Sequence, residues 1–211
     1  RVDGIAAIVG GAEANEGQRT ILRSDVELRA RLSLLGHDVT HALLGELPAS
    51  LLAATLDELL GEQLIATEAE RVEIAKPSPN EIARERRNIE HEAGGRRAVL
   101  QLLGRLDATE SELDTMAARR ALISAFLRAN LEGVTVVTEN EIDARLRGEG
   151  ARTSPPPSAA GEAAASPSAI ETRDEARAAI AKEALTRNVE RWVRVLRART
   201  RVRVLANFEA P

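Results

Sequence analysis

The chain has 211 residues, which suits one domain or one domain with an appendage, and 44% of them are hydrophobic and 29% charged, as in globular proteins. A net charge of −4 argues against general affinity for nucleic acid, and the lack of cysteine excludes disulfides and thiolate metal sites. Since Phe126, Trp192 and Phe208 are the only aromatic residues, the core must consist of Leu, Ile, Val and Ala, which favours helices.

The N-terminal segment predicts a hairpin followed by a helix. Residues 4–10 combine β-branched residues with flanking glycines, and residues 20–23 form a second short apolar run after a polar loop. Ser24 and Glu27 then have the spacing of a capping box, which predicts that a helix begins at Ser24 and ends near Gly36.

The middle of the chain predicts a series of helices. The expected ranges are 49–72, 80–93, 96–106, 109–131 and 138–147. The helices over 49–72 and 109–131 have apolar residues on two faces, which indicates packing from two sides. Thr109 with Glu112, and Thr138 with Glu141, again have the spacing of capping boxes.

The C-terminal part predicts a linker, a long helix and a strand. Residues 148–168 are rich in Pro, Ala and Gly, as linkers are, and the helix is expected over 169–198. Residues 201–205 then alternate Arg and Val, and a strand must pair to satisfy its backbone groups. We therefore expect this tail to return to the N-terminal hairpin. If Val204 is buried there, replacing it with Asp would destabilise the protein by several kcal/mol.

The order of several segments resembles the SurA chaperones, periplasmic proteins that assist the folding of outer-membrane proteins. The segments that carry this resemblance are VDGIAAIV at 2–9, ILRSDV at 21–26, LDELLGEQLI at 56–65, the turn at 77–81, VVTENEI at 136–142, and the closing helix and strand at 191–205. The resemblance implies a mainly α fold, a helical SurA N-terminal-type domain with a small β-sheet from the N-terminal hairpin and the C-terminal strand.

The resemblance also implies a domain organisation. Residues 1–147 would form the chaperone domain, residues 148–168 would be a flexible linker, and residues 169–211 would pack back on the chaperone domain. In familiar members of the family, one or two parvulin-type isomerase domains lie where this linker stands. Some twenty residues are too few for such a domain, so we expect no peptidyl-prolyl isomerase activity and keep isomerase only as a family label.

The function that follows is an ATP-independent holdase that binds unfolded outer-membrane or secreted proteins in an apolar groove. A structural or assembly module, with one fixed partner or with itself as partner, is the alternative; a homodimer could form by exchange of the C-terminal helix and strand. The chain begins at Arg1, without Met, so we expect a removed signal peptide and a periplasmic location, although a trimmed chain would look the same. No apolar run approaches the ~20 residues that span a bilayer.

Two sets of residues are singled out by this interpretation. The first comprises adaptable apolar side chains that could contact clients, with core packing as the equal alternative; it contains Met116, Leu122, Ile123, Phe126 and Leu127. The second comprises residues expected to hold the C-terminal tail on the N-terminal domain; it contains Trp192, Leu196, Val202 and Val204.

The remaining candidates for chemistry favour a protein without catalysis or cofactors. His37 and His41 have metal-ligand spacing, but they follow Gly36 in an expected loop and lack a third ligand, so no metal site is expected. No phosphate-binding loop is present. A basic stripe either attracts anionic partners or pairs with the acidic helix around residues 58–73. Its members are Arg187, Arg191, Arg194, Arg197, Arg199, Arg201 and Arg203.

Overall fold

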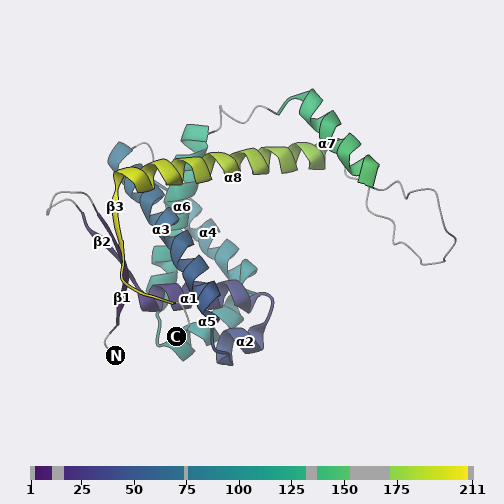
Figure 1. Ribbon diagram of the computed structural model, residues 1–211. Helices are drawn as coiled ribbons and strands as arrows, with labels where there is room; N and C mark the ends of the chain where they lie inside the picture. The colour runs from purple at the N-terminus through teal and green to yellow at the C-terminus, as the bar shows by residue number, and fades with distance from the viewer. Residues whose placement is uncertain (1–2, 11–16, 74–75, 132–136, 153–171, 209–211) are drawn as a thin grey trace, which may run out of the picture. The chain divides into compact units, whose positions relative to one another are not determined.

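The protein is mainly α-helical with one small antiparallel sheet, as predicted (Figure 1). The computed structural model describes residues 3–10, 17–73, 76–131, 137–152 and 172–208. The elements in chain order are β1 (Ile5–Gly10), β2 (Arg19–Leu22), α1 (Arg23–Leu35), α2 (Val39–Leu44), α3 (Ala49–Val72), α4 (Pro79–Glu92), α5 (Arg96–Leu106), α6 (Glu110–Leu131), α7 (Glu139–Arg152), α8 (Arg173–Arg199) and β3 (Arg201–Val204).

The chain divides into two compact units at positions that differ from the expected domain boundaries. The first unit contains Arg1–Ala129 together with Val193–Pro211, and the second contains Asn130–Trp192. One boundary therefore falls inside α8, whose last residues belong with the N-terminal part of the chain.

The sheet of the first unit joins the two ends of the chain, which confirms the predicted pairing. β1 is the central strand, and β2 and β3 flank it in antiparallel orientation. Ala7 lies opposite Ile21 on one side and Val204 on the other. Beyond β3, the N–H groups of Leu205 and Ala206 both donate to the Ala6 carbonyl, at 2.8 and 3.0 Å.

One face of this sheet is buried, but the burial stops at β3. Ala7, Val9 and Ile21 are buried, and α3 contacts both β1 and β2. Val204 shares that face because it is paired with Ala7, yet 54% of it is exposed. The condition attached to the predicted effect of Val204→Asp is therefore not met, since Val204 is exposed on the edge strand of the sheet.

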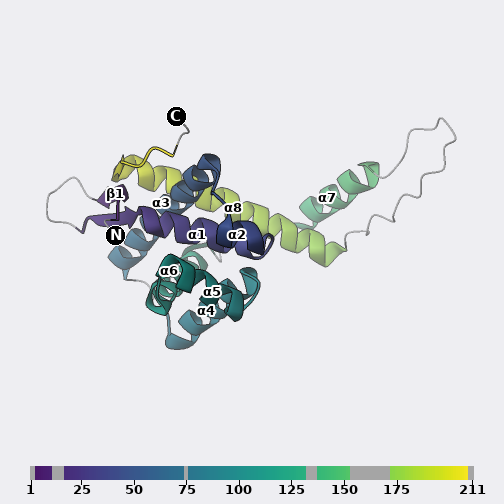
Figure 2. The ribbon, with the colours of Figure 1, turned by 90° about the horizontal axis from the view of Figure 1, so that it is seen from below.

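The helical core of the first unit lies among α1, α2, α4, α5 and α6, and Figure 2 shows α4, α5 and α6 grouped together beside α1. It consists of aliphatic side chains, as the composition requires. Its buried members are Leu28, Leu32, Leu35, Ala42, Ile89, Ala93, Val99, Leu102, Leu103, Leu113 and Ala117.

Helix starts follow the predicted capping chemistry in two of three places. The carboxylates of Glu112 and Glu141 accept the N–H groups of Thr109 and Thr138, at 2.5 and 2.8 Å, and satisfy groups that the helix leaves unpaired. The predicted box at Ser24 is wrong. The helix begins at Arg23 and the Leu22 N–H donates to Asp25 at 2.8 Å, while the Ser24 hydroxyl donates to Asp3.

Two helices differ in extent from the prediction. Residues 39–44 form the short helix α2 instead of a loop, because the Asp38 carboxylate accepts the His41 N–H at 2.9 Å and caps it. α7 continues to Arg152, past the expected end at residue 147 and into the expected linker. The rest of the predicted linker and the predicted start of the last helix at residue 169 lie outside the described residues.

The second unit contains α7 and most of α8, which are joined by ion pairs. Arg173 contacts Glu139 and Asp143, each at 2.6 Å, and Arg177 contacts Glu139 at 2.5 Å. These hydrogen bonds from Arg173 and Arg177 lower the pKa of Glu139. Trp192, which was expected to hold the tail, is half-buried at the end of this unit.

The C-terminal residues of the first unit make further contacts with it. Leu196 is buried, as expected for a residue that holds the tail, and Arg197 forms an ion pair with Asp57 of α3 at 2.6 Å. The Arg23 guanidinium lies 5.7 Å from the centre of the Phe208 ring, a cation–π contact between the start of α1 and the tail.

Candidate peptide-binding groove

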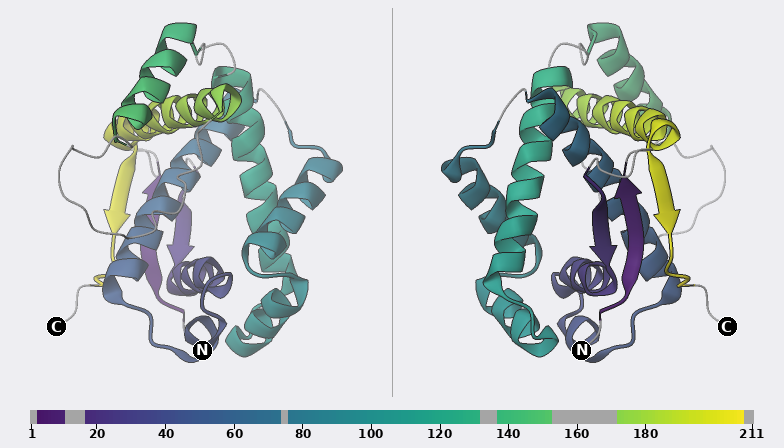
Figure 3. Two further views of the ribbon diagram at one scale, coloured as in Figure 1. Left: turned by 90° about the vertical axis from the view of Figure 1, so that its right-hand side faces the viewer. Right: turned by 90° about the vertical axis from the view of Figure 1, so that its left-hand side faces the viewer.

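A groove of about 450 Å³ lies in the first unit among α3, α6 and β2. α3 and α6 are the two helices whose sequences carry apolar residues on two faces. Figure 3 shows both of them as long helices. The groove has the size of sites that hold small ligands or a few side chains of a peptide.

Small apolar side chains form the floor of the groove. Ala66 and Ala69 supply it from α3, and Ala118 and Leu122 supply it from α6. Ala66 and Ala69 are one turn apart, as are Ala118 and Leu122, so each helix presents a short stripe. Alanines let a ligand approach the helix backbone closely, whereas larger side chains in the same places would fill the space.

Charged side chains of both signs form the rim. Arg19 of β2 and Glu70 of α3 make an ion pair at 2.7 Å, with about half of each side chain exposed. Glu73, Lys76 and Arg119 also line the groove. Glu73 follows the last residue of α3 and has a φ of 52°, in the left-handed region, as residues that end helices often do. A peptide in the groove would meet apolar surface below and mixed charge at the edges.

The groove contains a polar side chain in its floor but no histidine. Gln63 is buried, and its amide nitrogen donates to the Thr67 hydroxyl at 3.4 Å, a long hydrogen bond. In the described ranges, no three His, Asp or Glu side chains come close enough to hold a metal ion. The residues present can hold a ligand through apolar contact and hydrogen bonds.

The five predicted client contacts do not form one surface. Leu122 lines the groove, but Met116 packs against the helical core, and Ile123 and Leu127 are half-buried away from the groove lining. Phe126 is 2% exposed and therefore offers no surface to a partner. Of this set, Leu122 alone belongs to the groove.

Sequence reasoning missed most of the groove because it searched for large adaptable side chains. The floor is instead defined by alanines, and Ala66, Ala69 and Ala118 look like ordinary helix-forming residues in the sequence. A search for small residues one turn apart on two facing helices could have found these stripes. The contribution of Arg19 required knowledge of how β2 packs beside α3.

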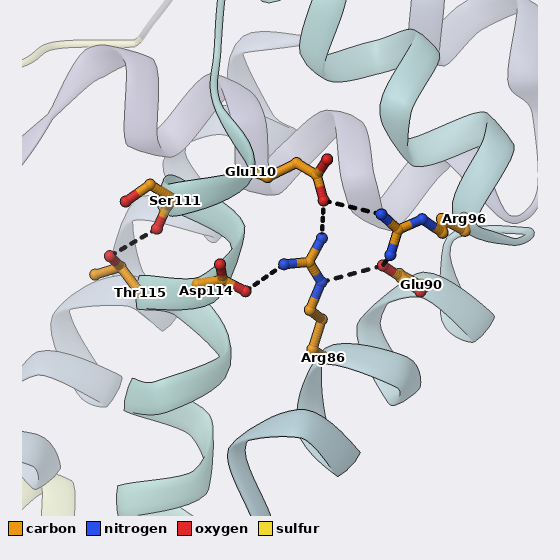
Figure 4. Close-up of polar contacts among 7 residues, drawn as sticks. All are labelled: Arg86, Glu90, Arg96, Glu110, Ser111, Asp114 and Thr115. Atoms are coloured by element: carbon orange, nitrogen blue, oxygen red, sulfur yellow. Dashed lines mark hydrogen bonds and ion pairs between the residues drawn. The ribbon is translucent and has the colours of Figure 1, made fainter. Parts of the chain in front are cut away.

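A cluster of charged side chains lies elsewhere, around Arg86 of α4 (Figure 4). Arg86 donates to Glu110 and Asp114 of α6, and it contacts Glu90 at 3.2 Å. Arg96 contacts Glu110 at 3.1 Å. Burial opposes the charged form of Arg86, but the hydrogen bonds from its guanidinium outweigh that effect and raise its pKa. All three guanidinium nitrogens of Arg86 therefore contact carboxylates, two of them on α6. This is a structural role, since it joins α4 to α6.

No protein-family model and no curated protein sequence matches the chain. None of the helices in the described part of the chain combines the length and the hydropathy needed to cross a bilayer.

Proposed function

We propose that the protein is a SurA-like periplasmic chaperone that binds unfolded segments of outer-membrane or secreted proteins without ATP and without isomerase activity. The groove between α3 and α6 is the proposed client site. The observation that carries the proposal is the combination of an alanine-lined floor with a rim of both charge signs.

The groove fits an unfolded chain better than a ligand of fixed chemistry. A holdase must accept many sequences, so its site needs apolar contact of modest strength and few directional groups. Ala66, Ala69, Ala118 and Leu122 are purely apolar, and Gln63 and Thr115 are the uncharged polar side chains of the lining. A rim with Arg19, Glu70 and Lys76 can accept client side chains of either charge.

The arrangement of the chain ends supports the proposed relation to the SurA family. That resemblance implies a C-terminal helix and strand that pack on an N-terminal domain, and β3 pairs with β1 here while Leu196 is buried.

A light-scattering assay tests the holdase activity. A β-barrel protein unfolded in urea is diluted into buffer, and its aggregation is followed with and without an equimolar amount of this protein. We expect clear suppression of scattering without nucleotide. Leu122→Glu should abolish most of it, because the substitution places a charge in the floor of the groove.

Leu100→Glu is the matched control, since Leu100 is an exposed leucine of α5 outside the groove, and it should suppress scattering like the wild type. Unchanged aggregation with the wild-type protein would overturn the proposal. Turnover of a proline peptide above background would overturn the absence of isomerase activity. Capture of one stoichiometric partner instead of many clients would favour an assembly module.

A further inference from the structure

We propose that the outer edge of β3 is a second peptide site, which takes up an extended peptide with alternating apolar and acidic side chains as a fourth strand of the sheet. This site is separate from the groove between α3 and α6, because no residue of β3 lines that groove.

β3 has a free hydrogen-bonding edge on the side away from β1. The Leu205 N–H points towards β1, where it donates to Ala6. Backbone groups alternate sides along a strand, so the N–H and C=O groups of Val202 and Val204 point away from β1. β3 ends the strand order, and no described strand lies beyond it (Figure 3). An extended peptide can bond to such an edge through its backbone.

An added strand would extend the apolar face that β1 and β3 share. Val202 lies opposite Val9 and Val204 lies opposite Ala7, so both valines continue the buried face of β1. Val204 is 54% exposed, and its outer side has no cover among the described residues. A peptide strand beside β3 would place every second side chain against these valines, and burial favours apolar residues there.

The other face of β3 is positively charged. Arg201 and Arg203 point to that face, and among the described residues neither forms an ion pair. Arg197 differs, because it is paired with Asp57. Acidic residues that alternate with the apolar ones would lie beside Arg201 and Arg203, and cross-strand pairs of opposite charge stabilise a sheet.

The same charges disfavour a second copy of the chain as the occupant. Two β3 strands placed edge to edge would bring four arginines into one short ladder, and like charges across strands are destabilising. β2 is a weaker candidate edge, since Arg19 is already paired with Glu70 of α3. An acidic, alternating peptide is therefore the occupant that fits.

The test measures binding of capped, fluorescein-labelled octapeptides to the full-length protein by fluorescence anisotropy. We expect a peptide of alternating Val and Glu to bind at least tenfold more tightly than one of alternating Val and Lys. It should also bind at least tenfold more tightly than a peptide with four Val followed by four Glu. Equal affinity for the alternating and the block peptide would overturn the proposal. Leu122→Glu should leave the affinity unchanged, which separates this site from the groove.

Val204→Pro tests the edge directly. Proline removes the outward N–H, and prolines are tolerated on edge strands when that N–H faces solvent, so the melting temperature should change little while peptide affinity falls at least tenfold. Unaltered binding by a folded Val204→Pro protein would contradict the proposal. Peptides N-methylated at the valines or at the glutamates give a second measurement on the wild type. One of the two should lose binding because only one set of N–H groups faces β3, and full binding by both would overturn the proposal.

A double variant tests whether Arg201 and Arg203 select acidic peptides. Reversal of both charges, with Arg201→Glu and Arg203→Glu together, should shift the preference at least tenfold towards the Val and Lys peptide. An unchanged preference for the Val and Glu peptide would show that the arginines do not select the ligand, which would overturn the proposed acidic occupant.

Discussion

Arg29 of α1 is a charged side chain with little access to water. It is paired with Glu62 of α3 at 2.7 Å, and the two side chains are only 12% and 21% exposed. Burial lowers the pKa of Arg29, and the charge of Glu62 opposes that effect. The pair therefore holds α1 to α3 through a charge that has little access to water.

Glu62→Gln should destabilise the protein by about 2 kcal/mol, because it leaves Arg29 buried without its compensating charge. The measurement is urea unfolding followed by circular dichroism, with the free energy of unfolding extrapolated to water.

Glu68→Gln is the control for this prediction. Glu68 also lies on α3 and pairs with an arginine, but its partner Arg71 is 71% exposed, so the change should be roughly 0.5 kcal/mol or less. An equal loss of stability in both variants would show that the burial of Arg29 does not determine how much the Arg29–Glu62 ion pair contributes to the free energy of unfolding.

At the scale of single elements, β3 shows two different environments on one short strand. Val202 is half-buried opposite Val9, whereas Val204 is mostly exposed opposite Ala7. Val202→Asp should therefore lower the free energy of unfolding by about 2 kcal/mol, since it buries a carboxylate without a partner. The same urea titration measures it.

Val204→Asp serves as the comparison, and its carboxylate remains in water, so the change should stay below about 1 kcal/mol. A larger effect at residue 204 than at residue 202 would contradict the observed burial of the strand.

The elements whose formation is a local event could be predicted from the sequence. Thr138 and Glu141 set the start of α7 through a cap that needs only residues three apart. The predicted cap at Ser24 did not form, because the Ser24 N–H and hydroxyl both donate to Asp3, which lies 21 residues earlier in the chain, while Asp25 accepts the Leu22 N–H. α2 was missed because its six residues lack a repeat of apolar positions, and a single cap from Asp38 supports it.

Features that depend on which elements meet could be predicted only in part. The alternation of residues 201–205 and the unsatisfied backbone of a lone strand were enough to predict that the tail pairs with β1. The exposure of Val204 was not available from the sequence, because Val204 shares the face of the buried Ala7 and differs from it only by lying on the edge strand. The groove was also hidden, since Ala66 and Ala118 become neighbours of one space only after α3 and α6 pack.

At the scale of the whole molecule, the return of the tail means that the first unit needs both ends of the chain. β3 hydrogen-bonds with β1, Leu196 is buried, and Arg23 contacts Phe208. A chain cut between α7 and α8 should therefore keep its two pieces together. A protease recognition sequence in place of residues 158–164 makes such a cut accessible to experiment.

We expect the cut protein to elute as one species that contains both fragments, with a mass equal to that of the uncut monomer. Leu196→Asp in the cut protein should release the C-terminal fragment, because the buried leucine holds it by apolar contact. A mass twice that of the monomer would instead reveal exchange of α8 and β3 between two chains. Separation of the wild-type fragments under native conditions would contradict a first unit that is completed by the tail. The hydrogen bonds of β3 and the burial of Leu196 would then not suffice to retain the C-terminal fragment.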